Sequence, residues 1–247
     1  MNVLLVRVGI DQTFGGWNAP VDPITREYVY VPIPEYPGVT CHPNMSRRFG
    51  EFAPSLQVFS QKHACELIPP KIPPNRLMHL DPDFSELTYG DIGSRRGARI
   101  RDMKCGDVLA FYASLSPISH YEHKLLYAMI GLYVIDEILP IHTVPKDQWH
   151  RNAHTRRRRH AETDIVVRAR PGVSGRFEKC IPIGCWKDRS YRVRPDLLDI
   201  WGGLSVRDGY IQRSAVPPRI LEPTRFLKWT ETHDVNLIAK NFAVERA

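Results

Sequence analysis

Long apolar runs are missing from this chain of 247 residues. No stretch approaches the roughly 18 consecutive apolar residues that a membrane-spanning helix needs, which argues against a membrane protein. The chain begins MNVLLVRVGID, without the basic leader and long apolar stretch of a secretory signal peptide. We therefore expect a cytoplasmic protein whose partners do not include a membrane.

Several familiar catalytic motifs are missing as well. The sequence has no Walker loop, and no dinucleotide fingerprint, Cys–His pair or Ser–His–Asp set stands out. The five cysteines form no C-x-x-C pair, and a cytoplasmic chain normally keeps its cysteines as thiols. These absences count against the common hydrolase, deaminase and redox enzymes, and the sequence names no cofactor.

Metal ligands with helical spacing occur once, at His150 and His154. Their i, i+4 spacing is that of a helical metal pair. They lie beside a run of arginines, however, and positive charge repels a cation. The sequence therefore predicts no metal site.

Positive charge is abundant but unevenly distributed. The formal net charge is +7, and residues 151–219 hold fourteen Arg and two Lys against seven Asp and Glu. The densest stretch contains four consecutive arginines, Arg156, Arg157, Arg158 and Arg159. Because each guanidinium needs a polar partner or water, we expect an exposed loop here. The local excess favours a nucleic-acid contact through these arginines over a merely solvated loop.

Apolar and aromatic runs bounded by turn residues predict a β-rich fold. NVLLVRV suits a buried strand, and GDVLAFYASL with LLYAMIGLYVIDEI suits a hairpin, with Gly131 at a bulge or close backbone approach. EYVYVPIPE predicts a further strand, and TDIVVRAR and RFEKCIPIG predict two more joined by the turn PGVSG. We expect one α+β domain over residues 1–247, with a mixed, mostly antiparallel sheet and few short helices.

The segment from Arg7 to Gly16, RVGIDQTFGG, places Asp11 at the end of a predicted strand and two glycines shortly after it. Strand ends are rigid, and glycine loops let a ligand approach the backbone, so such a segment is a common place for a site. The alternative is a tight turn in which Asp11 only accepts hydrogen bonds from nearby backbone N–H groups. Both interpretations stay open.

A second polar segment, HLDPDFSELTYGDIGSRRG, ends at Gly97. TYGDIGSRRG is too rich in glycine for a stable helix and too charged for a buried strand, so we expect a loop. Arginine forks bind phosphate, glycine N–H groups cradle it, tyrosine stacks on a base, and an aspartate serves as general base. The alternative is a set of exposed ion pairs, worth about 0–1 kcal/mol each.

These segments occur in an order that resembles a known family. VRVGIDQTFGGWNAP, YVYVPIPE, HLDPDFSELTYGD with RRGA, GDVLAFYASL and YAMIGLYVIDEI resemble the third class of the nucleotide modification associated domain family. The resemblance covers roughly the first 140 residues and, less clearly, the rest of the chain. It implies a role in DNA base hypermodification, with DNA or a nucleotide as partner and RNA as an alternative. KCGDVLAFYASL with IGLYVIDEI is also similar to PUA-like modules (the ASCH, EVE and YTH relatives), so a PUA-like fold is a second expectation.

The resemblance selects positions for a base and phosphate site. Those that match its motifs are Arg7, Asp11, Gly15, Gly16, Pro32, Glu35, Asp81, Asp83, Tyr89, Asp91, Arg95 and Arg96. We expect Asp11 and Asp91 to act in acid–base catalysis. The expected substrate-binding residues are Arg7, Gly15, Gly16, Asp81, Asp83, Tyr89, Arg95 and Arg96.

Three classes of function fit this sequence. The first is an enzyme acting on a base or nucleotide, which needs two carboxylates in one pocket. The second is a non-catalytic reader of modified bases, which needs an aromatic cleft; the candidates are Trp17, Tyr89, Phe111, Tyr112 and Tyr133. The third is an interaction subunit, with other subunits of a modification or defence complex as partners.

Overall fold

An eight-stranded sheet forms the centre of the computed structural model, which describes residues 1–68, 70–94, 97–213, 216–233 and 235–242. Its main path follows the order β1 (Val3–Arg7), β6 (Val108–Pro117), β7 (Leu126–Pro140), β8 (Asp164–Ala169) and β5 (Thr88–Ile92). The other three strands are β2 (Pro20–Val21), β9 (Gly175–Pro182) and β12 (Leu237–Ile238). Two small sheets pair β3 (Ile33–Pro34) with β4 (Met78–His79) and β10 (Gly184–Lys187) with β11 (Ser190–Val193).

The long hairpin of β6 and β7 organises this sheet, as the sequence predicts. β1 and β2 pair with β6 in parallel, and the remaining described ladders are antiparallel. The predicted α+β class with a mixed, mostly antiparallel sheet is therefore confirmed. Gly131 lies at an irregularity of β7: the register with both β6 and β9 shifts between Met129 and Gly131. The predicted bulge is thus confirmed.

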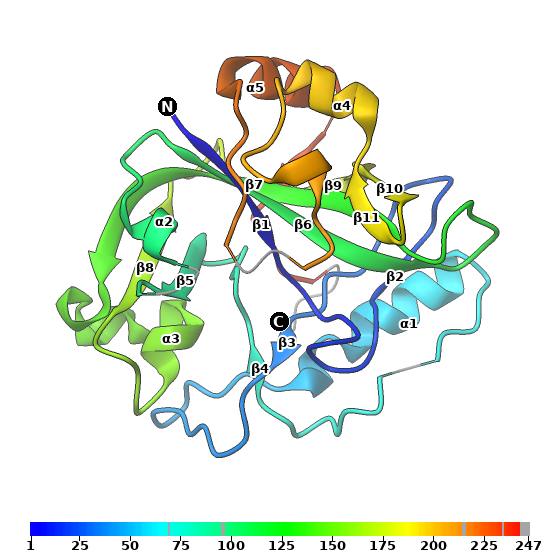
Figure 1. Cartoon of the computed structure of the whole chain (residues 1–247). Coiled ribbons are helices and arrows are strands. Elements are labelled where there is room, and N and C mark those ends of the chain that lie inside the picture. Colours follow the sequence, from blue (N-terminus) through cyan, green and yellow to red (C-terminus); the bar gives the residue numbers. More distant parts are fainter. Residues whose placement is uncertain (69, 95–96, 214–215, 234, 243–247) are drawn as a thin grey trace.

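Short helices lie on both sides of the sheet (Figure 1). The α-helices are α1 (Ala53–Lys62), α2 (Ala98–Arg101), α3 (Ala153–Arg156), α4 (Pro195–Ile200) and α5 (Pro223–Glu231). Four 3₁₀ helices are described, namely η1 (Phe49–Glu51), η2 (Ile141–Thr143), η3 (Lys146–Arg151) and η4 (Arg207–Gly209). No helix among the described residues has both the length and the apolar character of a membrane span.

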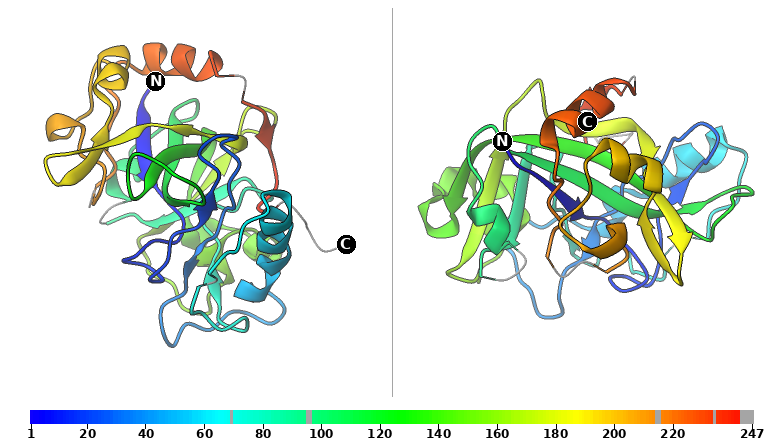
Figure 2. Two further views of the ribbon diagram at one scale, coloured as in Figure 1. Left: turned by 90° about the vertical axis from the view of Figure 1, so that its right-hand side faces the viewer. Right: turned by 45° about the horizontal axis from the view of Figure 1, so that its top comes forward.

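Both faces of the sheet are buried, which explains the unbroken apolar run of β1. Alternate side chains of a strand point to opposite faces. Val3 and Leu5 accordingly join an apolar cluster with Trp201 and Phe226, next to α4 and on α5. Leu4 and Val6 join a second cluster on the other face, to which α1 contributes Phe59. Figure 2 shows α4 and α5 together above the sheet and α1 below it.

Three sequence predictions need correction. TYGDIGSRRG was expected to be a loop, but its first five residues form β5, which pairs with β8. EYVYVPIPE was expected to be a strand, yet only Ile33–Pro34 forms one, because its prolines lack the N–H that a ladder requires. β8 and β9 exist as predicted but do not pair as a hairpin; both pair with different parts of β7.

Gly131 provides a test of how closely the sheet is packed. A Cβ at this position would lie 2.6 Å from the carbonyl oxygen of Gly175 and 2.8 Å from the ring of Phe84. We expect Gly131→Ala to lower the free energy of unfolding by about 1–3 kcal/mol, the usual cost of overpacking. Asp136→Ala, at an exposed position of the same strand, is the control and should change stability little. Equal unfolding midpoints for the two variants in urea would contradict the tight packing.

Candidate functional site

A cavity of about 590 Å³ lies beside β5 and the end of β1. Its lining comes from the segments 7–14, 33–36, 79–81, 89–92 and 154–157, together with Arg213. The volume is within the range of about 300–1,000 Å³ that is typical of small-molecule sites. The fold therefore brings together segments that are far apart in the chain, including the two polar segments selected from the sequence.

Five of the residues predicted to act in catalysis or substrate binding line the cavity, namely Arg7, Asp11, Asp81, Tyr89 and Asp91, and the motif position Glu35 lines it as well. Gly15 and Gly16 are not among its lining residues; with φ values of 109° and 68°, they instead shape the turn after β1. Arg95 and Arg96 lie outside the described residues. The predicted roles of all these residues in binding or catalysis stay predictions.

Asp11 is held by its own loop and by Arg7. Its Oδ1 accepts hydrogen bonds from the backbone N–H groups of Thr13 at 2.6 Å and Phe14 at 2.7 Å. Its Oδ2 lies 2.9 Å from the guanidinium of Arg7, which also donates to the carbonyl of Gln212. Both carboxylate oxygens are thus engaged, and only 5% of Asp11 is exposed. These contacts favour a positioning role for Asp11 over direct proton transfer.

Tyr89 and Asp91 form a hydrogen-bonded pair at the cavity wall. The hydroxyl of Tyr89 donates to Asp91 Oδ2 at 2.9 Å, and Asp91 Oδ1 accepts the N–H of Ile92 at 2.8 Å. The ring of Tyr89 packs 5.4 Å from that of Phe111 and is buried. Tyr89 therefore orients the half-buried carboxylate of Asp91, and its ring belongs to the core.

Asp83 lies beside the site but does not line the cavity. Its side chain is fully buried, and its Oδ2 lies 2.5 Å from Nη2 of Arg156. Its Oδ1 accepts a hydrogen bond from the side-chain amide of Asn241 at 2.7 Å. Its carbonyl accepts the hydroxyl of Tyr133 at 2.8 Å. These contacts give Asp83 a structural role, and the substrate contact that we expected of it stays a prediction.

The expectation of an exposed arginine run is wrong for its first half. Arg156 is 4% exposed and paired with Asp83. Arg157 makes a two-bond contact with Glu35, at 3.0 Å from Nε and 2.7 Å from Nη2. The arginines find buried carboxylates as partners, which satisfies the requirement that led us to expect solvent. Arg158 and Arg159 are exposed, so a nucleic-acid contact through them stays a prediction.

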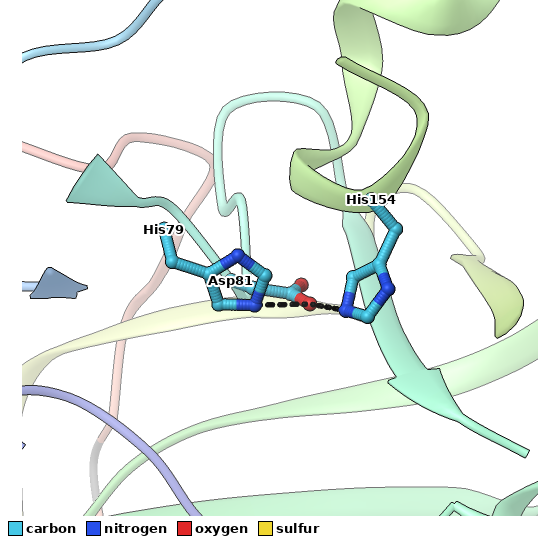
Figure 3. A group of neighbouring side chains, drawn as sticks. All are labelled: His79, Asp81 and His154. Carbon is cyan, nitrogen blue, oxygen red and sulfur yellow. Dashed lines mark ion pairs between the residues drawn. The ribbon is translucent and has the colours of Figure 1, made fainter. Parts of the chain in front are cut away.

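Two histidines face one carboxylate in the cavity wall. Nε2 of His79 and Nε2 of His154 each lie 3.7 Å from Oδ2 of Asp81, as Figure 3 shows. His79 ends β4, Asp81 follows two residues later, and His154 lies on α3. Both oxygens of Asp81 accept the N–H of Gly90, at 2.9 and 2.8 Å. Three groups that serve as metal ligands in proteins thus converge on one point.

Gly90 makes this convergence possible. A Cβ at Gly90 would lie 2.5 Å from the ring of His154 and 2.8 Å from the side-chain oxygen of Asn152. Only a residue without a side chain lets β5 approach α3 this closely and present its N–H to Asp81. The glycine in TYGD therefore serves backbone approach inside a strand, where the sequence suggested a flexible loop.

Each histidine is oriented by a further carboxylate. Nδ1 of His79 lies 3.0 Å from Oε1 of Glu35, and Nδ1 of His154 lies 2.8 Å from Oδ2 of Asp164. The carboxylates accept these N–H bonds, which leaves each Nε2 lone pair directed towards Asp81. Nη2 of Arg157 also lies 3.0 Å from Nδ1 of His79, but this guanidinium already has the oxygens of Glu35 as acceptors.

Burial controls the protonation of these groups. Burial lowers the pKa of His79 to about 4, against the opposing effect of Glu35, so His79 is neutral at pH 7. Burial would raise the pKa of Glu35, but the bonds to His79 and Arg157 outweigh it and lower the pKa to about 2. Because His79 is neutral, Arg157 supplies the positive charge that stabilises this carboxylate. Burial raises the pKa of Asp81 well above its usual range, against the bonds from Gly90.

Sequence reasoning missed several cavity residues. His79 precedes Asp81 by two residues, a spacing that puts two side chains on one face of an extended segment, and this was a usable signal. Nothing local connects them to His154, which the sequence paired with the exposed His150. Arg213 and the exposed aromatic Phe14 also line the cavity without a sequence signal of their own.

Apart from Tyr89, the aromatic residues proposed for a reader cleft lie elsewhere. Phe111, Tyr112 and Tyr133 are fully buried in the apolar clusters and line no part of the cavity. Trp17 is partly buried and donates its ring N–H to the carbonyl of Ile68. The aromatic side chains with exposed surface at the cavity are Phe14 and Tyr36.

Comparison with known proteins agrees with the sequence resemblance. The family model described as "nucleotide modification associated domain 3" matches residues 2–206. No curated protein and no solved structure matches the chain. The predicted family is therefore confirmed, whereas the likeness to PUA-like modules stays a prediction.

The buried arginine predicts a large stability effect. Arg156→Ala removes the cation that faces the fully buried Asp83, and an uncompensated buried charge costs about 3–5 kcal/mol. Arg159→Ala, three residues later and exposed, should change the free energy of unfolding by less than about 0.5 kcal/mol. Urea unfolding of both variants checks this prediction, and similar losses in the two would contradict the burial of Arg156.

Proposed function

Because the chain belongs to the nucleotide modification associated domain 3 family, we propose that its cavity binds a nucleotide, either free or within nucleic acid, for chemical modification of the base. DNA base hypermodification is the specific role that we propose. The single observation that supports this best is the meeting of the segments 7–14 and 79–92 around one cavity of nucleotide size. Both segments carry polar groups able to recognise a base or a phosphate.

Arg213 is the proposed phosphate contact. The guanidiniums of Arg7 and Arg157 already face the carboxylates of Asp11 and Glu35. Arg213 is exposed, lines the cavity, and has no ion-pair or hydrogen-bond partner among the described residues. A phosphate group would give it a charge-assisted, two-bond contact.

The base is proposed to lie against the apolar and aromatic part of the cavity. Phe14 is 45% exposed and Tyr36 is 63% exposed, and both line the cavity. Large exposed aromatic rings beside a cavity suit base stacking, which contributes about 1–3 kcal/mol per base. This arrangement replaces the stacking role that the sequence assigned to Tyr89.

A catalytic role is favoured over a purely binding role by the carboxylates. Asp91, Asp81 and Glu35 all line the cavity, so the requirement for two acids in one pocket is met. Asp91 is the best candidate for general acid–base chemistry, since its carboxylate is half-buried at the cavity wall and oriented by Tyr89. Asp11 is proposed to hold the loop and Arg7 in position.

Nucleotide titration tests the proposed site. We expect a set of nucleoside monophosphates, monitored by calorimetry, to include at least one that binds the wild type. Arg213→Ala should weaken its binding about 10-fold or more, as expected for the loss of a hydrogen bond to a charged group. Arg207→Ala is the matched control because Arg207 is exposed, lines no part of the cavity and carries the same charge. Equal effects of the two changes would contradict phosphate binding in the cavity.

Salt dependence tests the contact with nucleic acid. On duplex DNA the slope of log affinity against log salt is about −0.9 for each phosphate neutralised. If Arg158 and Arg159 each contact a phosphate, replacing both with alanine should make the slope less steep by about 1.8. A double alanine variant at Arg207 and Arg225, two other exposed arginines, has the same net charge and should keep the wild-type slope. Identical slopes for the two double variants would exclude the contact.

A further inference from the structure

We propose that His79, Asp81 and His154 bind one divalent first-row transition-metal ion in the wall of the cavity. Two imidazole nitrogens and one carboxylate oxygen form a donor set that suits Zn²⁺ or Fe²⁺. One ligand atom from each residue lies within 4.8 Å of the others. The metal binding itself does not depend on the proposed nucleotide function.

The spacing of the ligand atoms supports this proposal. Each Nε2 lies 3.7 Å from Asp81 Oδ2, too far for a hydrogen bond. Two ligand atoms that are each roughly 2.1 Å from one ion lie roughly 3.4 Å apart at a tetrahedral angle. These two distances therefore exceed those around a bound ion by only a few tenths of an ångström, and the ligand atoms of the two histidines lie within 4.8 Å of each other.

The surroundings orient these ligands as in established metal sites. A histidine that binds a metal usually donates its other N–H to a carboxylate or a carbonyl, which fixes the ring and its tautomer. Glu35 and Asp164 provide this contact to His79 and His154, respectively. Gly90 holds the carboxylate of Asp81 through its N–H. Thus all three ligands are fixed before any ion binds.

Charge gives an independent reason for a cation at this position. Asp81 and Asp164 are 7% and 2% exposed, and among the described residues neither is paired with a lysine or an arginine. Oδ1 of Asp164 is also buried without a hydrogen-bond partner in the described part of the chain. A divalent ion between the two histidines would place a positive charge beside both acids.

The neighbouring arginines do not prevent this. From the sequence we expected the arginine run to repel a cation near His154. Arg156 and Arg157 are instead neutralised by Asp83 and Glu35, at 2.5 and 2.7 Å. The electrostatic potential at the three ligands is therefore determined by the acidic side chains, which attract a cation.

Three protein ligands leave coordination positions open, and all three residues line the cavity. An ion held here binds water or an oxygen atom of a ligand in the cavity, and it acts on that group as a Lewis acid. This consequence rests on the proposed nucleotide function. Asp91, which also lines the cavity, provides a carboxylate to exchange a proton with such a group.

Metal binding is tested on the full-length protein after removal of metals with a chelator. We expect Zn²⁺ and Co²⁺ each to bind in a 1:1 ratio by calorimetry, and Co²⁺ to give visible absorption typical of nitrogen and oxygen ligands. Fe²⁺ under anaerobic conditions is the third probe. His154→Gln and Asp81→Asn should each weaken binding by more than about 100-fold, beyond the 10–100-fold loss typical of outer partners.

Two further variants give graded controls. Asp164→Asn alters the residue that orients His154, so it should weaken binding by about 10–100-fold. His150→Gln alters an exposed histidine one turn before His154 and should leave binding unchanged. Folding of each variant is checked by circular dichroism. If His154→Gln or Asp81→Asn does not fold, His79→Gln takes its place, because His79 is the most exposed of the three ligands. Binding of no equimolar ion by the folded wild type, or equal affinity in the His150 and His154 variants, would overturn the proposal.

A nucleotide titration separates this proposal from the proposed function. Nucleoside monophosphates are titrated into the metal-free and Zn²⁺-loaded proteins. Equimolar metal binding without nucleotide binding supports the metal site and counts against the nucleotide function. Nucleotide binding by a protein that takes up no metal supports the nucleotide function and counts against the metal site.

Discussion

Two ion pairs connect the end of α3 to segments from the first half of the chain that lie at or beside the cavity. Arg156 contacts Asp83, and Arg157 contacts Glu35. Consecutive residues at the end of α3 thus bind two acids from different segments of the first half of the chain. Because His154 lies on the same short helix, these pairs also fix its distance from His79 and Asp81. A change in either pair would therefore move the residues that face the cavity.

This arrangement has an energetic consequence. Burying charged groups costs free energy, and the cost is offset only when both partners are present in good geometry. Such pairs add little net stability, but they penalise any structure in which the segments separate. Asp83 makes the penalty larger, because Asn241 near the C-terminus and Tyr133 on β7 also bind it. The buried charges thus specify one arrangement of segments that lie far apart in sequence.

The strands of the β6–β7 hairpin could be predicted from the sequence, because a local run of apolar residues indicates a buried strand. β6 and β7 are long apolar runs, and Gly131 lies at the bulge in the pairing of β7 with β6 and β9. β5 could not be predicted in this way. Its glycine and aspartate resemble loop residues, and only the position of His154 on α3 explains why a glycine is required there.

In the candidate site, too, some features follow from local sequence pattern and others depend on residues far away in the chain. Convergence of Asp11 and Asp91 on one cavity could be proposed from motif order, but no local pattern could establish it. The arginine run was misjudged because a guanidinium can be satisfied by a buried acid as well as by water, and the partners Asp83 and Glu35 lie far away in the sequence. The histidines were missed for a related reason: the sequence pairs His154 with His150, whereas the fold pairs it with His79.

The charges that line the cavity bear on both the proposed nucleotide and the proposed metal ion. Its wall contains four carboxylates, those of Asp11, Glu35, Asp81 and Asp91; Arg7 pairs with Asp11, and Arg157 pairs with Glu35. A nucleotide phosphate placed against a carboxylate would be repelled, so we propose its anionic end near Arg213. The base end then faces the acidic side, where neutral or cationic groups are tolerated. A metal ion at His79, Asp81 and His154 would reverse the local charge and allow oxygen atoms of the ligand to approach that side as well.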